Sequence, residues 1–406
     1  MALPGMRREK GRFRHEACGM SAGLIIVGAS HAGVTVAAEL RAAGFQPAIT
    51  LVSDETSEPY HRPHLSKECL ATDAEPGMLK PTTFYEEKGI ERLNARVDAI
   101  DPDGRRIVTS DGKSFEYATL ILATGAKPRG LPAGLPGAEL ALTLRDRADL
   151  GVLRARLATS RQLAIIGGGL IGLEIAAAAR SKGMSVDVVE CADRLMSRCI
   201  SPELANLVRE RHVAAGITFH MSSNVKAVTS QGIELTDGVF IPADLVIASV
   251  GSQPRTELAA RAGLTCDDGI LVGVDGSSSV TGIFALGDCA RWPDPGLTRG
   301  IRHESIAATL WQAKAVAAAL TGRPLPASTP LRLWSQQGAM RIQMAGPIEA
   351  ATHGHITAAE GGHILYGFST GRLSSVQAMD APRAFNTAVA RIGSCEADFR
   401  AEAATS

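Results

Sequence analysis

LAIIGGGLIGLEIAAAARSKGMSVDVVE, residues 163–190, decides the fold expected of this chain. An apolar segment over Leu163–Ile166 runs into a glycine turn and then an alanine-rich stretch, and a second apolar segment over Ser185–Val189 ends at Glu190. Strand, glycine turn, helix, strand and carboxylate in this order are typical of a dinucleotide-binding βαβ unit. A packing turn without a ligand is the alternative, and it leaves the closing carboxylate unexplained.

Each glycine of this turn has its own steric task. Gly167 permits the tight turn, Gly169 lets backbone N–H groups approach a pyrophosphate, and Gly172 lets helix and strand pack closely. The helix N-terminus adds unpaired N–H groups and a partial positive charge. Glu190 stands where a carboxylate can accept hydrogen bonds from both hydroxyls of an adenosine ribose, which favours NADH over NADPH.

A second unit of this kind begins near the N-terminus. LIIVGASHAG, residues 24–33, predicts a strand and glycine turn, and Val34–Ala43 predicts a helix that stops at Gly44. Gly28 and Gly33 match turn glycines, whereas Ser30 replaces the middle one and leaves less room for a phosphate. The next apolar segment, Ala48–Val52, leads to Asp54 and Glu55, of which Asp54 is the first choice for a ribose. Two nucleotide sites are therefore predicted.

Two later segments of the sequence resemble each other and indicate an internal duplication. SDGKSFEYATLILATGAKPR (110–129) resembles TDGVFIPADLVIASVGSQPR (236–255), each with an Asp-Gly turn, an apolar strand and a glycine-containing exit. We predict an α/β fold with two Rossmann-like, glutathione-reductase-type nucleotide-binding domains, one inserted in the other, and a small C-terminal α+β domain. The predicted boundaries are residues 21–130 and 255–324 for the first domain, 131–254 for the second and 325–406 for the third.

Two further segments are expected near the first nucleotide. GIFALGDCA, residues 282–290, predicts a strand that ends at Asp288, whose carboxylate can accept hydrogen bonds from a ribityl chain. Residues 302–320 predict a helix that starts at Arg302 and points its positive end at the same ligand. EPYHRPHLSKECL, residues 58–70, is a polar loop that either covers the ligand or is a plain surface loop.

Composition excludes several classes of partner. Lys plus Arg and Asp plus Glu each number 42 in 406 residues, so neither nucleic acid nor a membrane is an expected partner. The seven cysteines form no close pair, which indicates a reducing, cytoplasmic setting and no dithiol centre. His353, His355 and His363 lack companions at ligand spacing, so no metal is predicted. Residues 1–20 predict a disordered or non-native extension, with Met20 as the favoured start.

The order of motifs resembles the FAD- and NADH-dependent ferredoxin reductases of bacterial aromatic ring-hydroxylating dioxygenase systems, together with putidaredoxin and rubredoxin reductases. GASHAG, PYHRPHLSK, LILATGAKPR, IIGGGLIGLE, ALGDCA, RHESI, LWSQQ and APRAF carry the resemblance over Leu24–Phe385. It implies that Lys67 and Glu174 form a catalytic pair beside the flavin and that Trp334 lies on a shielding domain. It also implies that Ala32, Asp54, Lys67, Asp288 and Ile301 contact FAD. With the residues of the two turns and their neighbours added, the full set predicted for FAD is Gly28, Ser30, Ala32, Gly33, Asp54, Glu55, Arg62, Lys67, Ala123, Thr124, Gly125, Asp288 and Ile301; the set for NAD is Gly167, Gly169, Gly172, Glu174, Glu190 and Gly251.

Three departures from the family pattern stand out. Leu142 occupies the place of an arginine that is expected to contact FAD, and this predicts a lost phosphate or adenine contact. Gln336 and Gly338 replace a carboxylate and an aromatic ring of the Trp-Ser-Asp-Gln-Tyr motif, near the expected docking face. Asp380-Ala381-Pro382 stands where the family has Asn-Arg-Pro.

The resemblance implies a flavoprotein that passes electrons from NADH through FAD to a small iron-sulfur carrier, a [2Fe-2S] ferredoxin or a rubredoxin, which feeds an oxygenase. An NADH oxidase or quinone reductase is one alternative, although the loop His61–Lys67 has no redox cysteine and Cys69 lies just beyond it. A non-enzymatic flavoprotein like apoptosis-inducing factor is another. Either a monomer or a homodimer is compatible with the sequence.

Overall fold

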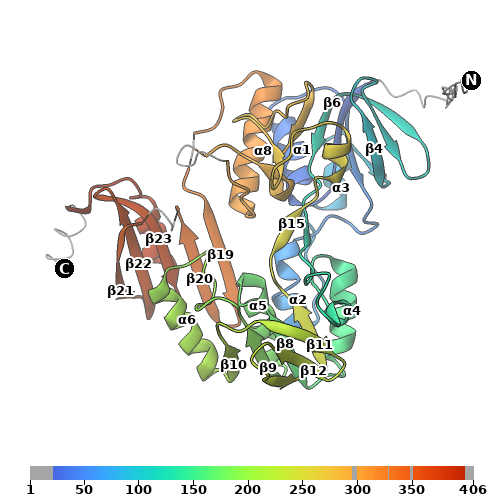
Figure 1. The fold of residues 1–406 in the computed structure, drawn as a ribbon. Helices are drawn as coiled ribbons and strands as arrows, with labels where there is room; N and C mark the ends of the chain where they lie inside the picture. The colour runs from blue at the N-terminus through green and yellow to red at the C-terminus, as the bar shows by residue number, and fades with distance from the viewer. Residues whose placement is uncertain (1–21, 295–299, 328, 348–350, 398–406) are drawn as a thin grey trace, which may run out of the picture.

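The computed structural model describes residues 22–294, 300–327, 329–347 and 351–397, so the expected extension over residues 1–20 lies outside the described residues. Two α/β units and one antiparallel sheet make up the chain, as predicted (Figure 1). The domain boundaries remain predictions.

The first unit is a parallel sheet in the order β3-β2-β1-β6, to which β17 adds beside β6. Nearly every side chain of β1 and β2 is buried, and α1 packs against both strands and against α8. An antiparallel excursion of β4 and β5 continues from β6. The bounds are β1 Gly23–Val27, α1 His31–Ala42, β2 Ile49–Ser53, α3 Thr82–Glu87, β3 Ile90–Asn94, β4 Val97–Asp101, β5 Arg106–Thr109, β6 Ser114–Leu122, α7 Glu257–Arg261, β16 Ile270–Leu271, β17 Ile283–Ala285, η3 Gly287–Cys289, β18 Ala290–Arg291 and α8 Ile306–Thr321.

The second unit repeats this plan on a smaller scale. Its parallel sheet has the order β10-β9-β8-β14, and β11, β12 and β13 form the antiparallel excursion. Figure 1 shows this unit below the first, with α2 beside it although α2 belongs to the first unit by sequence. The bounds are η1 Arg62–His64, α2 Glu68–Thr72, η2 Ala138–Leu140, α4 Arg147–Leu157, β8 Gln162–Ile166, α5 Leu170–Ser181, β9 Ser185–Val189, α6 Pro202–Ala214, β10 Ile217–His220, β11 Val225–Thr229, β12 Gly232–Leu235, β13 Phe240–Pro242 and β14 Leu245–Ala248.

The duplicated segments meet each other in space. Their exits, β7 (Ala126–Pro128) and β15 (Ser252–Pro254), pair as antiparallel strands and join the two units (Figure 1). Gly112 and Gly238, the glycines of the two Asp-Gly turns, have φ of +81° and +90°, the left-handed conformation that glycine adopts at little cost. The sequence repeat is therefore a structural repeat.

The third unit is an antiparallel sheet in the order β19-β20-β23-β22-β21, with α9 on one face. Met340, Ile342 and Met344 of β20 form one apolar cluster with Leu173 of α5 and Leu204 of α6. This sheet is therefore anchored on the second unit. The bounds are β19 Arg332–Gln337, β20 Met340–Ala345, β21 His353–Ala359, β22 Gly362–Ser369, β23 Arg372–Met379 and α9 Pro382–Val389.

Candidate functional site

Backbone contacts at the first glycine turn leave no space for side chains. A Cβ on Gly28 would lie 2.2 Å from the carbonyl oxygen of Ala123, and one on Gly33 would lie 1.8 Å from that of Gly28. Gly28 also has φ of +112°. The turn therefore needs glycine at both positions, because it brings β1, β6 and the first turn of α1 into direct backbone contact.

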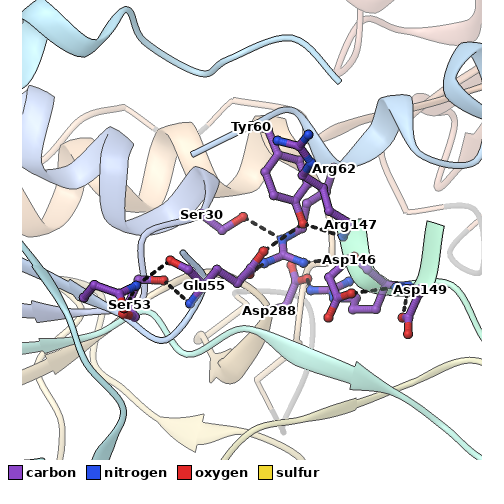
Figure 2. A network of polar contacts seen from close by, with 11 residues as sticks. Ser30, Ser53, Glu55, Tyr60, Arg62, Asp146, Arg147, Asp149 and Asp288 are labelled. Atoms are coloured by element: carbon purple, nitrogen blue, oxygen red, sulfur yellow. Dashed lines mark hydrogen bonds and ion pairs between the residues drawn. The ribbon is translucent and has the colours of Figure 1, made fainter. Parts of the chain in front are cut away.

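Ser30, Glu55, Tyr60 and Arg62 form a polar network beside this turn (Figure 2). Arg62 Nε donates to Ser30 Oγ over 2.9 Å, and the same guanidinium pairs with the Glu55 carboxylate. The Tyr60 hydroxyl donates to Glu55 Oε2 over 2.8 Å. Burial, with Glu55 nearby, raises the pKa of Tyr60 above its usual range, so this donor keeps its proton.

Of the two carboxylates predicted for a ribose, this network includes Glu55, the second choice, and not Asp54. Asp54 is exposed, whereas Glu55 lines a small hollow together with Ser30, Ser53 and Arg62. The hydrogen bond from the Glu55 backbone N–H to Ser53 Oγ (3.2 Å) holds the turn that aims the side chain inward. Glu55 is therefore the better placed residue for a ribose at the end of β2.

Asp288 lies at the end of β17 and pairs with Arg145, whose Nη2 is 2.8 Å from Asp288 Oδ2. Two backbone contacts hold Arg145 in place. Its N–H donates to Asp149 Oδ2, and its carbonyl accepts from Arg62. Asp146 caps α4 through the Asp149 N–H. Arg145 was not predicted from the sequence, although it directly precedes the helix-capping Asp146.

Leu142 does not remove a cation from this site. It forms a backbone bridge with Ile247 beside the second sheet, and its side chain packs with the core of the second unit. Arg145, three residues further on, supplies a positive charge beside Asp288. The lost FAD contact at Leu142 stays a prediction.

Other predicted FAD residues gather at the ends of β6 and β17. Ala123 is buried, Thr124 Oγ1 donates to the Arg255 carbonyl over 2.8 Å, and Gly125 has φ of +69°. A Cβ on Gly287 would lie 2.7 Å from the Ala32 Cβ, so the Asp288 turn abuts the first turn of α1.

Ile301 lies outside any helix and pairs its backbone with Trp292. The prediction that a helix begins at Arg302 is wrong by one turn, since α8 begins at Ile306. The Ser305 side chain caps α8 by accepting from the Ala308 N–H, and this cap sets the start.

The second turn has the geometry that its sequence predicts. Cβ atoms on Gly167 and Gly172 would meet carbonyl oxygens at 2.4 and 2.3 Å, while one on Gly169 would meet nothing within 4 Å. Gly251, at the end of β14, has φ of +105° and lies next to the Arg198 guanidinium. The Glu190 carboxylate accepts from the N–H groups of Gly168 (2.7 Å) and Ala192 (2.8 Å), which places it against the turn.

Lys67 and Glu174 form an ion pair of 2.8 Å between the two units, and their side chains are 13% and 4% exposed. Ser66 and Ser335 also donate to the Glu174 carboxylate, the latter over 2.6 Å. Lys67 Nζ lies 4.9 Å from the centre of the Trp334 ring. All three units therefore contribute a side chain to this one carboxylate or to its cation.

Gln336 and Gly338 lie at the hairpin between β19 and β20 rather than beside Lys67. Gln336 Nε2 donates to the Gly338 carbonyl over 2.8 Å, and Gly338 has φ of +64°, which suits glycine at a tight turn. A Cβ on Gly338 would lie 3.7 Å from the Ala177 Cβ. The two replaced positions, Gln336 and Gly338, therefore lie where the β19–β20 hairpin packs against α5.

Three histidines, His31, His61 and His64, lie close together where the first turn of α1 meets the loop His61–Lys67. His31 Nε2 lies 3.3 Å from His61 Nδ1, and the His61 and His64 rings stack at 5.1 Å. Burial, with the nearby His61 and Arg62, lowers the pKa of His31 to about 4. His31 is therefore neutral near pH 7, and the first turn of α1 gains no charge from it. Within the described ranges, no group of three His, Cys, Asp or Glu side chains is arranged for a metal.

The residues present fit two dinucleotides. Among the described helices of more than ten residues, α4, α6 and α8 carry side-chain caps from Asp146, Ser201 and Ser305, whereas α1 and α5 carry none. The first N–H groups of α1 and α5 thus lack a side-chain acceptor, and each helix follows a glycine turn. Phosphates are suitable acceptors at such a helix end.

Comparison with known proteins gives consistent matches. Residues 23–309 match the family model described as pyridine nucleotide-disulphide oxidoreductase. The chain is 36% identical to the rhodocoxin reductase of Rhodococcus erythropolis, covering 89% of this chain and 87% of that protein. It is 35% identical to the ferredoxin–NAD(+) reductase subunit of the benzene 1,2-dioxygenase system of Pseudomonas putida, covering 89% and 90%. The covalent putidaredoxin reductase–putidaredoxin complex matches with a TM-score of 0.85 at 32% identity, covering 92% of each chain.

Proposed function

The chain belongs to the pyridine nucleotide-disulphide oxidoreductase family, and from that premise we propose that it passes electrons from NADH through FAD to a small iron-sulfur carrier that feeds an oxygenase. The printed names of the relatives support this assignment, because they are reductases of a ferredoxin or a comparable redox protein. The protein is an oxidoreductase that uses FAD and NADH.

The observation that carries the proposal is the ion pair between Lys67 and Glu174. Lys67 belongs to the first unit by sequence and directly precedes α2. Glu174 lies on α5, the helix that follows the second glycine turn. A flavin held by the first unit and a nicotinamide held by the second would meet at this pair. Flavin, when bound, supplies the conversion of a two-electron hydride donor into a one-electron donor.

We assign the first site to FAD. Its phosphates would lie at Gly28, Ser30 and the first turn of α1, with Arg62 and Arg145 as cations, its adenosine ribose at Glu55, and its ribityl hydroxyls at Asp288. Ala123, Thr124 and Gly125 would line the end of β6. Ala32 and Ile301 remain predicted contacts from the resemblance.

We assign the second site to NADH. Its pyrophosphate would lie at Gly167, Gly169 and Gly172, beside Gly251, and its adenosine ribose at Glu190. The Glu190 carboxylate can exchange its two backbone partners for ribose hydroxyls without moving to another part of the fold.

Around the reaction centre, this chain contributes charge and enclosure. Lys67 brings a positive charge, and Glu174 and the Pro63 carbonyl orient its amine. Such a cation favours the negative charge that reduction adds to a flavin. The ring of Trp334, on β19 of the third unit, lies against the Lys67 amine. The one cysteine near this loop, Cys69, is buried, and burial raises the pKa of its thiol, so it is a poor electron relay.

For the partner, we propose a [2Fe-2S] ferredoxin or a rubredoxin that approaches the side of Trp334 and Leu310. These side chains are 40% and 44% exposed, and they lie on β19 and α8, two elements that pack together. Exposed large apolar side chains of this kind suit a transient electron-transfer interface. We also propose a cytoplasmic monomer or homodimer. No helix in the described part of the chain could span a membrane.

The test is to purify the protein with FAD, reduce it with NADH, and compare turnover with a [2Fe-2S] ferredoxin, a rubredoxin, a quinone and oxygen. We expect kcat/KM with an iron-sulfur carrier to exceed that with quinone or oxygen by at least about 100-fold. Faster turnover with quinone or oxygen would assign an oxidase or quinone reductase. Slow reduction without any efficient acceptor would assign a non-enzymatic flavoprotein.

A further inference from the structure

Glu174 stands at one end of a chain of buried side chains that ends at His212 on α6. Ser335 Oγ is 2.6 Å from Glu174 Oε1, Gln337 Nε2 is 3.2 Å from Ser335 Oγ, and Gln337 Oε1 is 2.7 Å from His212 Nε2. All four side chains are at most 4% exposed. These four hydrogen-bonded side chains run from α5 of the second unit to β19 of the third unit and back to α6 of the second unit.

The hydrogen positions in this chain follow from simple counting. Ser335 has one hydroxyl hydrogen, and the Glu174 carboxylate can only accept, so Ser335 must donate to it. Gln337 must then present its amide N–H groups to Ser335 and its carbonyl to His212. The carbonyl only accepts, so His212 carries a hydrogen on Nε2. Every hydrogen bond therefore donates in the direction of Glu174.

His212 takes part in this chain in its neutral form. Burial lowers its pKa, although its hydrogen bond to Gln337 acts in the opposite direction. A neutral ring with its hydrogen on Nε2 gives the chain a fixed direction without adding a second charge. A row of aligned donors strengthens the hydrogen bond at its end, because each bond polarises the next.

We propose that His212, Gln337 and Ser335 are positioning residues that hold the Glu174 carboxylate aimed at Lys67, and so set the rate of hydride transfer from a distance. This inference rests on the proposed function of the Lys67–Glu174 pair. It assigns a role to the third unit beyond covering the flavin, because two members of the chain, Ser335 and Gln337, lie on its first strand.

Other charged groups near Glu174 have partners elsewhere. Lys67 is the one charged side chain with a described contact to the Glu174 carboxylate. On the elements packed around it, Glu68 faces His64, Asp187 faces His220, Arg180 bonds the Ala215 and Met184 carbonyls, and Arg332 bonds Asn386. The described contacts of the Glu174 carboxylate are therefore those with Lys67, Ser66 and Ser335.

The kinetic test uses three variants and a matched control. Ser335→Ala removes the last donor, His212→Leu removes the first, and His212→Gln keeps an N–H group at a similar reach. Gln377→Leu is the control, because the buried Gln377 links the same two units by accepting from the Ser201 N–H at the start of α6, outside the chain. Flavin reduction by NADH is followed by rapid mixing between pH 5 and 9, with FAD content and Tm recorded.

We expect Ser335→Ala to slow reduction about tenfold near pH 7, because the Glu174 carboxylate loses the hydroxyl that aims it at Lys67. His212→Leu should act in the same direction by about threefold, and His212→Gln should stay within about twofold of wild type. Gln377→Leu should lower Tm but leave rate and profile unchanged. Equal effects of His212→Leu and Gln377→Leu would overturn the proposal, since both would then report only packing.

A second measurement does not depend on turnover. Histidine ¹⁵N NMR of the oxidised holoenzyme should show one ring, identified by its absence in His212→Leu, that is neutral and protonated on Nε2 at pH 7. A ring protonated on Nδ1, or a charged ring, would overturn the proposed direction of the chain. A wild-type protein that NADH does not reduce would refute the proposed function instead, and this NMR result would still decide the state of the chain.

Discussion

Glu55 and Glu190 follow the second strands of the two nucleotide units, yet their carboxylates have different partners. Glu55 pairs with Arg62 and accepts from Tyr60, both from the loop that follows β2 (Figure 2). Glu190 accepts from the N–H groups of Gly168 and Ala192, one in its own glycine turn and one two residues on. The Glu55 carboxylate is therefore held by side chains, and the Glu190 carboxylate by backbone N–H groups.

This difference suits two modes of nucleotide use. At the first site, Arg62 contacts the Arg145 carbonyl and Arg145 pairs with Asp288, so three distant segments enclose the ligand position. A nucleotide held by all of them would leave slowly. At the second site, a ribose needs to displace only the bonds of Glu190. We infer that the duplicated unit diverged into one site for a resident cofactor and one for a substrate that exchanges at each turnover.

The largest effect is expected from Asp288→Ala, which would open the enclosed site. The change removes the acceptor for ribityl hydroxyls and leaves Arg145 without its partner, so FAD affinity should fall at least about 100-fold, the loss of two hydrogen bonds to a charged group. Fluorescence titration of the deflavinated protein measures this. Asp98→Ala is the control, because Asp98 makes an exposed surface pair with Arg96 on the same unit. Equal affinities in both variants would remove Asp288 from the site.

The ion pair between the units should control rate more than binding. Lys67→Met and Glu174→Gln should each slow flavin reduction about 10- to 100-fold while FAD stays bound, because each leaves a buried partner uncompensated. The double variant Lys67→Met/Glu174→Leu should recover part of the lost Tm but none of the rate, which separates stability from chemistry. Stopped-flow rates equal to wild type in both single variants would contradict the assignment.

The NADH site should select against a 2′-phosphate. A phosphate at Glu190 would face a like charge, a penalty of about 1–3 kcal/mol, so wild type should prefer NADH about 10- to 100-fold in kcat/KM. Glu190→Gln should narrow that gap. Arg194 donates to the Ser197 carbonyl of its own loop, and Arg198 lies by Gly251, so neither offsets the repulsion. Arg198→Gln serves as the control and should leave the preference unchanged.

The turns and sheets were predictable because they depend on local steric rules. Gly28, Gly33, Gly167 and Gly172 all lie where a Cβ would meet a backbone oxygen, and such glycines are visible in a sequence. Lys67 and Glu174 were placed together only through a resemblance, since 107 residues separate them. No local pattern indicates such a pair.

The misses share one cause, which is that contacts between distant segments are absent from the sequence pattern. Arg145 belongs to the second unit by sequence but pairs with Asp288 of the first. Ser335 and Gln337 were quoted only as parts of a motif, and their bonds to Glu174 and His212 depend on how the third unit packs. The start of α8 was misjudged because helix propensity extends over Arg302–Ser305, while the Ser305 cap decides the first turn.

The smallest predicted effect separates Glu55 from Asp54. If Glu55 holds the FAD ribose, Glu55→Gln should weaken FAD binding about three- to tenfold, because a neutral amide accepts weaker hydrogen bonds from hydroxyls and also loosens Arg62. Asp54→Asn is the matched variant one residue earlier, and its exposed side chain should change affinity by less than about twofold. Both affinities come from the same fluorescence titration at one ionic strength. A larger loss in Asp54→Asn than in Glu55→Gln would restore the order of the sequence analysis, and it would mean that the end of β2 rearranges when FAD binds.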